Sequence, residues 1–352
     1  MTKSPPRYYE AEKSPLFRIS SPQALAKLLG IELPALISLC EEGDSAYDQY
    51  LNKDNDRWIE TPRPPLKEIQ QRIHRLLCKI MPPDYLFSGY KFRGAVKNAE
   101  RHLASSGTYM AKLDIRRFYP SSHGGRVFRL FYNDFQCDSR AADMLAKLCT
   151  IGKTRNSSWR HLPTGGVTSP ILAYFAYQHM FGEIETLARH NGLILSVVAD
   201  DITLSGEMAS SAVIEEVKKT LEVYGLRSNF KKQKLWSGKH NNKRVTGVMV
   251  TPKGLRVPLA QKEKIRELRD QIRQEKNPRR RNKLYQKWLG SLSSAGLIES
   301  RFSIGAREGL REWKGDKEAW AYQVAMSNSK GPGKASGYQW QFSSSQRISN
   351  PL

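Results

Sequence analysis

Apolar residues recur at helical spacing along much of the chain, and the longest of these stretches predict helices. In residues 66–80 the isoleucines and leucines fall on one face, and the Pro-Pro pair that follows would end the helix. Near the N-terminus, Ser21 suits a helix cap and Pro22 suits the first helical turn. Further helices are expected over residues 95–103, 125–150, 171–189 and 212–224, and in a highly charged region that ends near residue 294.

Short continuous apolar runs predict strands. Residues 109–115 form one such run, and Asp114 stands near its end. Residues 193–199 form a second run, which would pair with residues 202–205 in a hairpin whose turn is Asp200 and Asp201. Residues 245–251 predict a further β stretch. Two of the predicted strands therefore carry carboxylates at an end.

The composition is that of a soluble globular enzyme, since 39% of the 352 residues are hydrophobic and 26% are charged. No run reaches about 18 apolar residues, so no transmembrane helix is predicted. The N-terminus lacks the apolar segment of a secretory signal, and we expect a cytoplasmic protein with no membrane partner. The four cysteines show no paired spacing, which argues against a cysteine-based metal site.

The net charge of +23 points to a polyanionic partner, and nucleic acid is the leading one. Residues 227–287 hold 20 lysines and arginines against four acids, which is +16 of that total. A solvated basic surface or an anionic membrane patch would be the alternatives. Residues 327–352 contain no acid and many serines and glycines, so we expect a weakly structured tail or a small additional element.

The carboxylates of Asp114, Asp200 and Asp201 are the leading catalytic candidates. If they converge they repel one another unless a divalent cation neutralises them. Mg²⁺ suits such a site because it prefers oxygen ligands, and two ions can activate a hydroxyl and stabilise a leaving pyrophosphate. An Asp-Asp pair between strands is also common in a plain turn, so the pattern of these residues alone leaves both alternatives open.

Three ordered motifs in the middle of the chain resemble those of reverse transcriptases. Residues 114–121, DIRRFYPS, resemble the first palm motif of that family. Residues 162–170, LPTGGVTSP, resemble its LPQGxxTSP turn, and residues 198–201, VADD, resemble its YxDD box. On these motifs the chain is similar to the reverse transcriptase family.

Shorter elements narrow the resemblance to the reverse transcriptases of bacterial retrons. Residues 98–102, NAERH, resemble the retron NAxxH element, and residues 245–247 match the retron VTG element. Residues 225–232 resemble the G…N..K stretch that separates VTG from the YxDD box. The resemblance covers roughly residues 58–290.

The resemblance implies an α+β fold of the right-hand polymerase type, with an antiparallel palm sheet and a helical thumb. It implies fingers over residues 58–110, together with part of 125–165, a palm over 111–254 and a thumb over 255–326. An N-terminal helical extension, 1–57, and the Ser/Gly-rich tail, 327–352, flank these domains.

The implied activity is that of an RNA-directed DNA polymerase using dNTPs. Two Mg²⁺ ions would be held by Asp114, Asp200, Asp201 and the backbone carbonyl of Ile115. The implied partner is a cognate structured noncoding RNA, copied into RNA-linked single-stranded DNA (msDNA). An accessory effector protein and a role in anti-phage defence are also implied.

Further site residues follow from the same resemblance. Tyr119 resembles the steric gate that excludes a 2′ hydroxyl, with a core aromatic as the alternative. The other candidate nucleotide contacts are Lys91, Arg93, Thr164, Gly165, Gly166 and Lys232. Asn98 and His102 share a helix face, so they would bind RNA or lock the fingers. The candidate RNA contacts of the thumb are Arg279, Arg280, Arg281 and Trp288, with a solvated helix as the alternative.

Two residues depart from the family pattern. Thr164 stands where the family usually has Gln, and Val198 stands where it usually has Tyr or Phe. Neither is one of the three carboxylates, so activity is expected to survive. The alternatives are another defence-related or intron-related reverse transcriptase, or a catalytically vestigial RNA-binding scaffold for an effector. A nuclease would need similar metals but not Tyr119 beside the first carboxylate.

Overall fold

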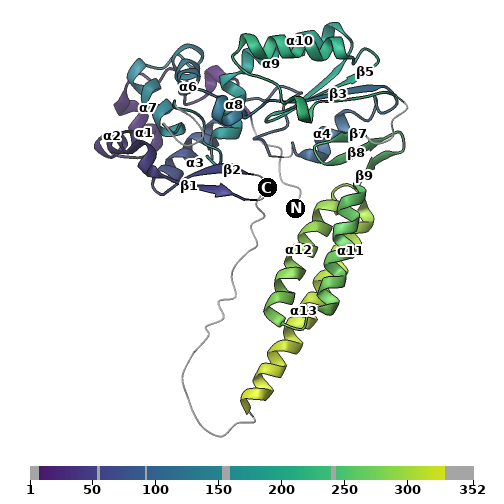
Figure 1. Ribbon diagram of the computed structural model, residues 1–352. Coiled ribbons are helices and arrows are strands. Elements are labelled where there is room, and N and C mark those ends of the chain that lie inside the picture. Colours follow the sequence, from purple (N-terminus) through teal and green to yellow (C-terminus); the bar gives the residue numbers. More distant parts are fainter. Residues whose placement is uncertain (1–7, 54–55, 92, 153–158, 239–242, 330–352) are drawn as a thin grey trace. The chain divides into compact units, whose positions relative to one another are not determined.

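The computed structural model describes residues 8–53, 56–91, 93–152, 159–238 and 243–329, and the chain divides into two units (Figure 1). Unit 1 runs to Pro258 and unit 2 begins at Leu259, close to residue 255 where the thumb was predicted to begin. Within the described residues, unit 1 combines helices with three antiparallel sheets, and unit 2 consists of helices. This content is that of the predicted α+β class.

Four antiparallel strands form the sheet that carries the acidic residues, in the order β4–β5–β3–β6. Their bounds are β3 Tyr109–Asp114, β4 Ile194–Val198, β5 Asp201–Gly206 and β6 Lys234–Trp236. Side chains alternate between the two faces along each strand. On one face, Ala111 and Leu113 of β3 lie opposite Leu204 and Ile202 of β5, and all four are buried. Helices α9 (Gln178–His190) and α10 (Ser211–Val223) lie along the sheet (Figure 1).

The opposite face of this sheet is polar. Lys112 lies opposite Thr203, and Asp114 lies opposite Asp201, so these four side chains share the face. Helix α4 (Ala95–Arg101) packs near this face, followed by His102, whose ring reaches two serines of β4 and β5. The sheet therefore separates an apolar core from a polar, largely buried face that carries the carboxylates.

A three-stranded sheet follows in the order β7–β8–β9. Its strands are β7 Lys243–Val245, β8 Val248–Thr251 and β9 Gly254–Arg256. The single β stretch predicted over residues 245–251 is wrong, because Thr246 and Gly247 form a turn between two strands. Their φ angles are 43° and 84°, and a tight hairpin turn needs such positive values, which glycine adopts at little cost.

A two-stranded hairpin and several helices make up the rest of unit 1. Strands β1 (Tyr47–Asn52) and β2 (Arg57–Pro62) pair in full register. The predicted boundary after residue 57 falls within β2, which hydrogen-bonds to β1. The helices not yet mentioned are η1 Ala11–Lys13, α1 Pro22–Leu29, α2 Leu33–Glu42, η2 Gly43–Ala46, α3 Leu66–Leu77, α5 Phe118–Ser121, α6 Gly124–Arg129, η3 Leu130–Asp134, α7 Ser139–Cys149, α8 Ser169–Ala176 and η4 Phe230–Lys232.

Two predicted helices are interrupted. The helix expected over residues 125–150 divides because Asp138 caps a new helix, α7, by accepting hydrogen bonds from Arg140 N and Ala141 N. The helix expected over residues 171–189 divides at Tyr177 into α8 and α9. Helix α3 begins at Leu66 as predicted and ends at Leu77.

The N-terminal helices show the predicted cap. Ser21 accepts a hydrogen bond from Ala24 N at 3.2 Å, and Pro22 occupies the first helical position of α1.

No single helix among the described residues is long and apolar enough to span a membrane. By length and composition alone, α1 and the segment Leu33–Ala46 would pass that test together as a pair bent by 94°.

Unit 2 is a bundle of three helices: α11 (Leu259–Gln274), α12 (Pro278–Gly296) and α13 (Ser300–Ser329). Among the side chains that the structure describes, the buried apolar ones of this bundle are Ile265, Leu268, Ile272, Tyr285, Trp288, Leu292 and Ala295, all from α11 and α12. Gly309 of α13 packs so closely on Trp288 that an added Cβ would lie 2.5 Å from the indole ring. Helix α13 continues past residue 326, and residues 330–352 of the predicted tail lie outside the described residues.

Candidate active site

Three aspartates meet at one end of the four-stranded sheet. Asp114 is the last residue of β3 and lies opposite Asp201, the first residue of β5. Asp200 precedes Asp201 in the β4–β5 turn, and its backbone oxygen accepts a hydrogen bond from Ile115 N at 2.8 Å. The antiparallel register therefore brings the two sequence motifs together.

The turn of this hairpin differs by one residue from the prediction. Val198 pairs with Asp201, so the turn consists of Ala199 and Asp200 rather than of the two aspartates. Ala199 has a φ of 51°, which is unusual for a residue with a side chain. Tight two-residue hairpins need such a positive φ. The consequence is that Asp201 is held in a strand, whereas Asp200 is held in the turn.

Burial, together with the nearby charge of Asp114, raises the pKa of Asp200 to about 6. The largest cause is burial, which penalises the charged carboxylate, and the next is the negative charge of the neighbouring Asp114. Asp114 is itself buried, with 3% of its surface exposed. Two carboxyl groups in contact in a largely desolvated position form a site that favours a cation.

Two lysines lie against these carboxylates. Lys232 Nζ is 2.6 Å from Asp114 Oδ2, and Lys112 Nζ is 2.8 Å from Asp201 Oδ2. Lys232 was predicted to contact nucleotide phosphates, whereas in this structure it neutralises Asp114. Lys112 was not predicted at all. Its signal in the sequence is its place two residues before Asp114, which puts both side chains on one face of the strand.

A pair of carboxylates at this site suits magnesium. Within the part of the chain that the structure describes, no group of three or more histidine, cysteine or acidic side chains is arranged to hold a metal ion. Asp114 and Asp200 make a pair, while Asp201 contacts Lys112. Mg²⁺ commonly takes one or two carboxylates and completes its coordination with water and substrate phosphates, so the pair fits this ion.

Tyr119 lies next to the acidic centre. It belongs to the short helix α5, which begins after Arg117, a residue with a φ of 49°. Burial raises the pKa of Tyr119 to about 12, and the charge of Asp200 adds to the shift. The ring is half-buried. A half-buried tyrosine is thus held beside the catalytic candidates.

The turn of residues 162–167 lies next to α5. Leu162 N donates a hydrogen bond to Ser122 O at 3.1 Å, directly after the helix that carries Tyr119. Gly165 has a φ of 114°, and an added Cβ on Gly166 would lie 2.5 Å from Pro163 Cγ. Thr164 is half-buried. Both glycines are therefore required by the tight path of the backbone.

The two cations of the 91–93 loop differ. Lys91 is exposed. Arg93 donates hydrogen bonds from Nη1 to the backbone oxygens of Pro83 and Leu86, the latter at 3.0 Å. Arg93 therefore already stabilises the loop that precedes it, and Lys91 is the less constrained candidate for an incoming phosphate.

Asn98 and His102 are buried and link elements of unit 1. The two ring nitrogens of His102 lie 2.7 Å from Ser205 Oγ and 2.7 Å from Ser196 Oγ. Burial lowers the pKa of His102 to about 3, so the ring is neutral. Asn98 Nδ2 donates a hydrogen bond to Thr246 Oγ1 at 3.2 Å, which joins the NAxxH-like and VTG-like elements. Neither side chain is accessible, which favours the alternative that they lock the fold.

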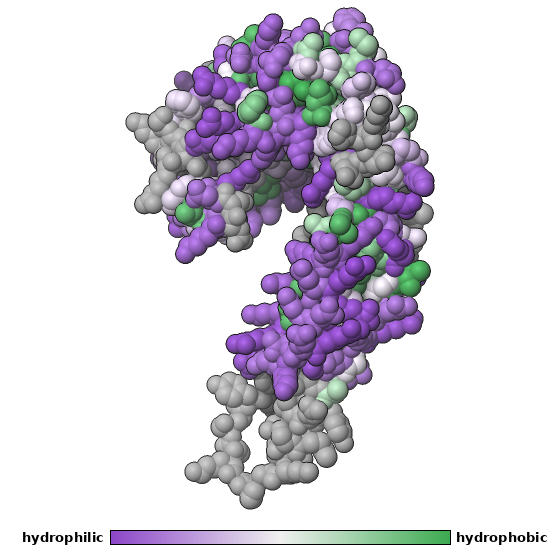
Figure 2. Space-filling model, turned by 45° about the vertical axis from the view of Figure 1, so that its right-hand side comes forward, coloured by the Kyte–Doolittle hydropathy of each residue, from purple (hydrophilic) through white to green (hydrophobic). Residues whose placement is uncertain are grey.

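Of the four predicted RNA contacts in unit 2, two have partners within the bundle and two are exposed. Trp288 is buried and packs against Tyr285, and Arg281 pairs with Asp316. Both side chains therefore already have partners within the bundle, which favours a structural role over a grip on RNA. Arg279 and Arg280 are exposed. The visible face of the bundle is mostly hydrophilic, with scattered hydrophobic patches (Figure 2).

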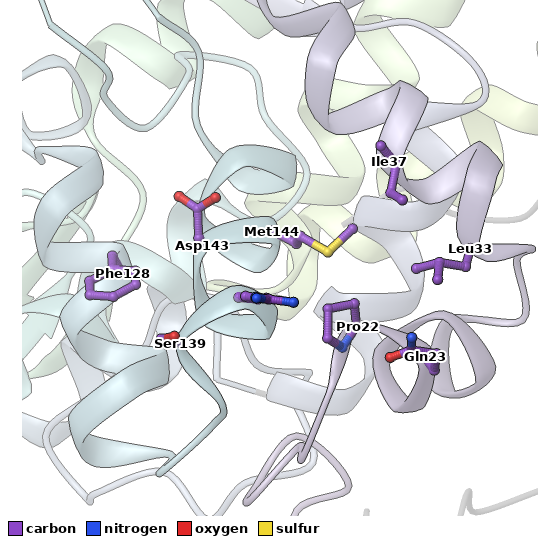
Figure 3. Close-up of a pocket in the computed structure, with 9 residues that line it drawn as sticks. Pro22, Gln23, Leu33, Ile37, Phe128, Ser139, Asp143 and Met144 are labelled. Atoms are coloured by element: carbon purple, nitrogen blue, oxygen red, sulfur yellow. The ribbon is translucent and has the colours of Figure 1, made fainter.

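A pocket of about 590 Å³ lies elsewhere in unit 1 (Figure 3). It is formed between helices α1, α2, α6 and α7. Its lining includes Leu33, Ile37 and Met144, together with the charged Asp143. It contains none of the motif residues, so it is separate from the acidic centre.

The chain belongs to the reverse transcriptase family. Residues 51–276 match the family described as reverse transcriptase (RNA-dependent DNA polymerase), and this range is more than half of the chain. The antiparallel sheet with carboxylates at a strand end and in the adjacent hairpin is thus the palm of a right-hand polymerase. The predicted fold class is confirmed.

Among curated proteins, the chain is similar to several reverse transcriptases of retrons. The retron Se72 enzyme of Salmonella heidelberg (strain 579083-10) is 27% identical over 244 residues, which are 66% of this chain and 62% of that protein. The retron Ec86 enzyme of Escherichia coli is 26% identical over 219 residues, or 61% and 64%. The retron Mx162 enzyme of Myxococcus xanthus is 25% identical over 308 residues, or 77% and 62%. The predicted resemblance to retron reverse transcriptases is confirmed, and the chain spans just under two thirds of the length of these relatives.

Proposed function

We propose that this chain is an RNA-directed DNA polymerase. The observation that carries the proposal is the strand register that places Asp114 opposite Asp201, with Asp200 in the adjoining turn at the end of the palm sheet. In the reaction a primer hydroxyl oxygen bonds to the α-phosphorus of a dNTP. The bond from that phosphorus to the bridging oxygen breaks, pyrophosphate leaves, and the hydroxyl proton is released.

Asp114, Asp200, Asp201 and the backbone carbonyl of Ile115 would hold two Mg²⁺ ions. When bound, these ions supply the positive charge that activates the hydroxyl and stabilises the leaving group. Lys112 and Lys232 neutralise Asp201 and Asp114 in the structure described here. Lys232 is 45% exposed at its side chain, so it can turn from Asp114 to a phosphate of the nucleotide.

Selection of the sugar is proposed for Tyr119. Its half-buried ring beside Asp200 supports a position under the sugar of the incoming nucleotide, where it would exclude a 2′ hydroxyl. Thr164, Gly165 and Gly166 would bring the backbone of their turn close to the same nucleotide, and Lys91 is the candidate for its triphosphate. The exposed Arg279 and Arg280 would contact RNA phosphates.

The template is proposed to be a cognate structured noncoding RNA, and the product to be RNA-linked single-stranded DNA (msDNA). The NAxxH-like and VTG-like elements and the similarity to the retron Se72 and Ec86 enzymes support this assignment. An accessory effector protein and a role in anti-phage defence belong to the same proposal.

The test is dNTP incorporation by the protein purified together with its native RNA. Wild type is compared with Asp200→Asn/Asp201→Asn, and the product is treated with RNase and with DNase. A DNase-sensitive product that only wild type makes, and that stays joined to RNA, supports the proposal. A wild-type protein that holds RNA and makes no DNA contradicts it.

The second candidate is an RNA-binding scaffold with a vestigial centre. The two lysine–carboxylate ion pairs favour it, because a centre that binds no metal can be neutralised in this way. The same experiment separates the two functions, since a scaffold retains RNA without incorporating dNTPs.

A further inference from the structure

A set of buried polar side chains holds the 162–167 turn in place from outside the acidic centre. We propose that Glu60 and Gln70 are positioning residues for the incoming nucleotide, because they fix the backbone of this turn. The inference rests on the proposed polymerase function, in which the turn faces the dNTP. Neither residue belongs to the motifs that identified the family.

Glu60 satisfies both backbone groups of Thr164. It lies on β2 and is fully buried. Its backbone N–H donates to Thr164 O at 2.7 Å, and its Oε2 accepts from Thr164 N at 2.9 Å. A charged acceptor makes the stronger kind of hydrogen bond to a backbone N–H. The peptide groups on both sides of Thr164 are thereby fixed relative to the β1–β2 hairpin.

His161 balances the charge that Glu60 brings into the interior. The ring is fully buried, and its Nε2 lies 3.2 Å from each carboxyl oxygen of Glu60. Its Nδ1 lies 3.1 Å from the carbonyl oxygen of Trp159, which can only accept, so Nδ1 carries a hydrogen. A proton held between Nε2 and the carboxyl group would make the pair neutral as a whole. A buried carboxylate without such a partner would be strongly destabilising.

Gln70 fixes the far end of the same turn. It lies on α3 and is fully buried, and its Oε1 accepts from Val167 N at 3.2 Å. Its Nε2 donates to Tyr47 OH and to Leu148 O, both at 2.9 Å. Because both N–H groups have acceptors, the amide cannot rotate without losing these bonds.

Gly165 shows how closely the turn lies on β2. An added Cβ would be 3.1 Å from Ile59 Cγ2 and 3.2 Å from Glu60 O. The turn and the β1–β2 hairpin are therefore in contact through backbone as well as through the Glu60 carboxyl group. A nucleotide that contacts the turn would meet a surface whose shape Glu60 and Gln70 have set in advance.

Glu60→Met and Glu60→Gln separate the hydrogen bond from the charge. Methionine fills similar space but leaves Thr164 N without its acceptor. Glutamine keeps an acceptor for Thr164 N and can donate from its amide to Nε2 of a neutral His161. Asp48→Asn is the matched control, since it removes an exposed carboxylate from the same hairpin.

Two measurements are made on the full chain with its copurified RNA: hydrogen exchange of the 162–167 amides, and the KM and kcat for dNTP. For Glu60→Met we expect faster exchange in the turn and a KM raised about tenfold, with kcat changed less than about threefold. Glu60→Gln and Asp48→Asn are expected to stay within about twofold of wild type. Thermal melting of each variant verifies that it is folded.

Unchanged exchange in a folded Glu60→Met protein would overturn the inference, and so would faster exchange with an unchanged KM. A Glu60→Gln variant as impaired as Glu60→Met would also overturn it, because charge rather than the hydrogen bond would then matter. If wild type incorporates no dNTP, the proposed function fails. The exchange measurement, which needs no catalysis, still decides whether Glu60 holds the turn.

Discussion

The palm sheet and the α11–α13 bundle use charge in opposite ways. In the palm, a few acidic side chains are buried and crowded, and the pKa of Asp200 rises as a result. In the bundle, many basic side chains lie at the surface, as Arg279 and Arg280 do. Buried like charges create a local demand for a cation, whereas exposed cations create a field that attracts any polyanion.

The difference teaches which kind of charged residue can be assigned from a sequence. Asp114 and Asp201 are fixed by strand register, so their neighbours follow from the pairing of two motifs. In the bundle, Arg279 and Arg281 are neighbours in the sequence but differ in use. Arg281 pairs with Asp316 of α13, whereas the side chain of Arg279 is exposed. A run of like residues does not reveal which of them the fold needs for itself.

The largest effect is expected for Asp114→Asn. Loss of one carboxylate from the acidic centre should lower dNTP incorporation by about 1,000-fold or more, because metal-assisted charge stabilisation contributes several kcal/mol to the barrier. Asp143→Asn, at a half-buried aspartate paired with Lys147 and outside the acidic centre, should leave the rate unchanged. Steady-state incorporation on the copurified RNA measures both. Near wild-type activity of Asp114→Asn would contradict the claim that the buried carboxylates of the palm sheet are needed for catalysis.

His102→Ala tests the polar face of the palm sheet. The change leaves the hydroxyls of Ser196 and Ser205 without their partner and opens a cavity, so the free energy of unfolding should fall by about 2–4 kcal/mol. His179→Ala, at an exposed histidine, should change it by less than about 0.5 kcal/mol. Urea denaturation followed by circular dichroism compares them. Equal stability of the two variants would contradict a locking role for His102.

Asp200→Asn should stabilise the protein in the presence of EDTA. The pKa of Asp200 is raised from 3.8 to about 6 in the folded state, so the charged carboxylate opposes folding above that pH. The penalty is absent below about pH 4 and complete above about pH 6, and its removal is expected to gain about 1–3 kcal/mol at pH 7.5. Urea denaturation at pH 7.5 and pH 4.5 measures the gain at each. A gain that does not depend on pH would contradict the crowding of the carboxylates.

Arg279→Ala and Arg281→Ala give the smallest and most discriminating comparison. Arg281 forms a half-buried pair with Asp316, so its loss should lower the stability of the bundle by about 1 kcal/mol. Arg279→Ala should leave stability unchanged and weaken RNA binding. It should also reduce the slope of log binding constant against log salt concentration by about one. Thermal melting and filter binding at several salt concentrations separate the two. If the two variants showed the same stability and the same RNA binding, Arg281 and Arg279 would not have the separate structural and RNA-binding roles proposed here.

Several elements of the palm could be predicted because their pattern is local. The apolar runs 109–115 and 193–199 correspond to β3 and β4, and the spacing of residues 66–80 corresponds to α3. The turn at Thr246 was missed because Val245 and Val248 continue an apolar run across it. Glu60, His161 and Gln70 were missed because a lone polar residue in a sequence carries no sign of its burial.

The sequence by itself determined the family, the order of the motifs and the identity of the acidic residues, because these depend on residue type and spacing along the chain. Only the tertiary structure decided which lysines neutralise Asp114 and Asp201, that His102 is enclosed, and that Glu60 holds Thr164. These contacts join residues that are about 90 or more positions apart. Their partners are chosen by packing in three dimensions, where burial makes each unsatisfied polar group costly.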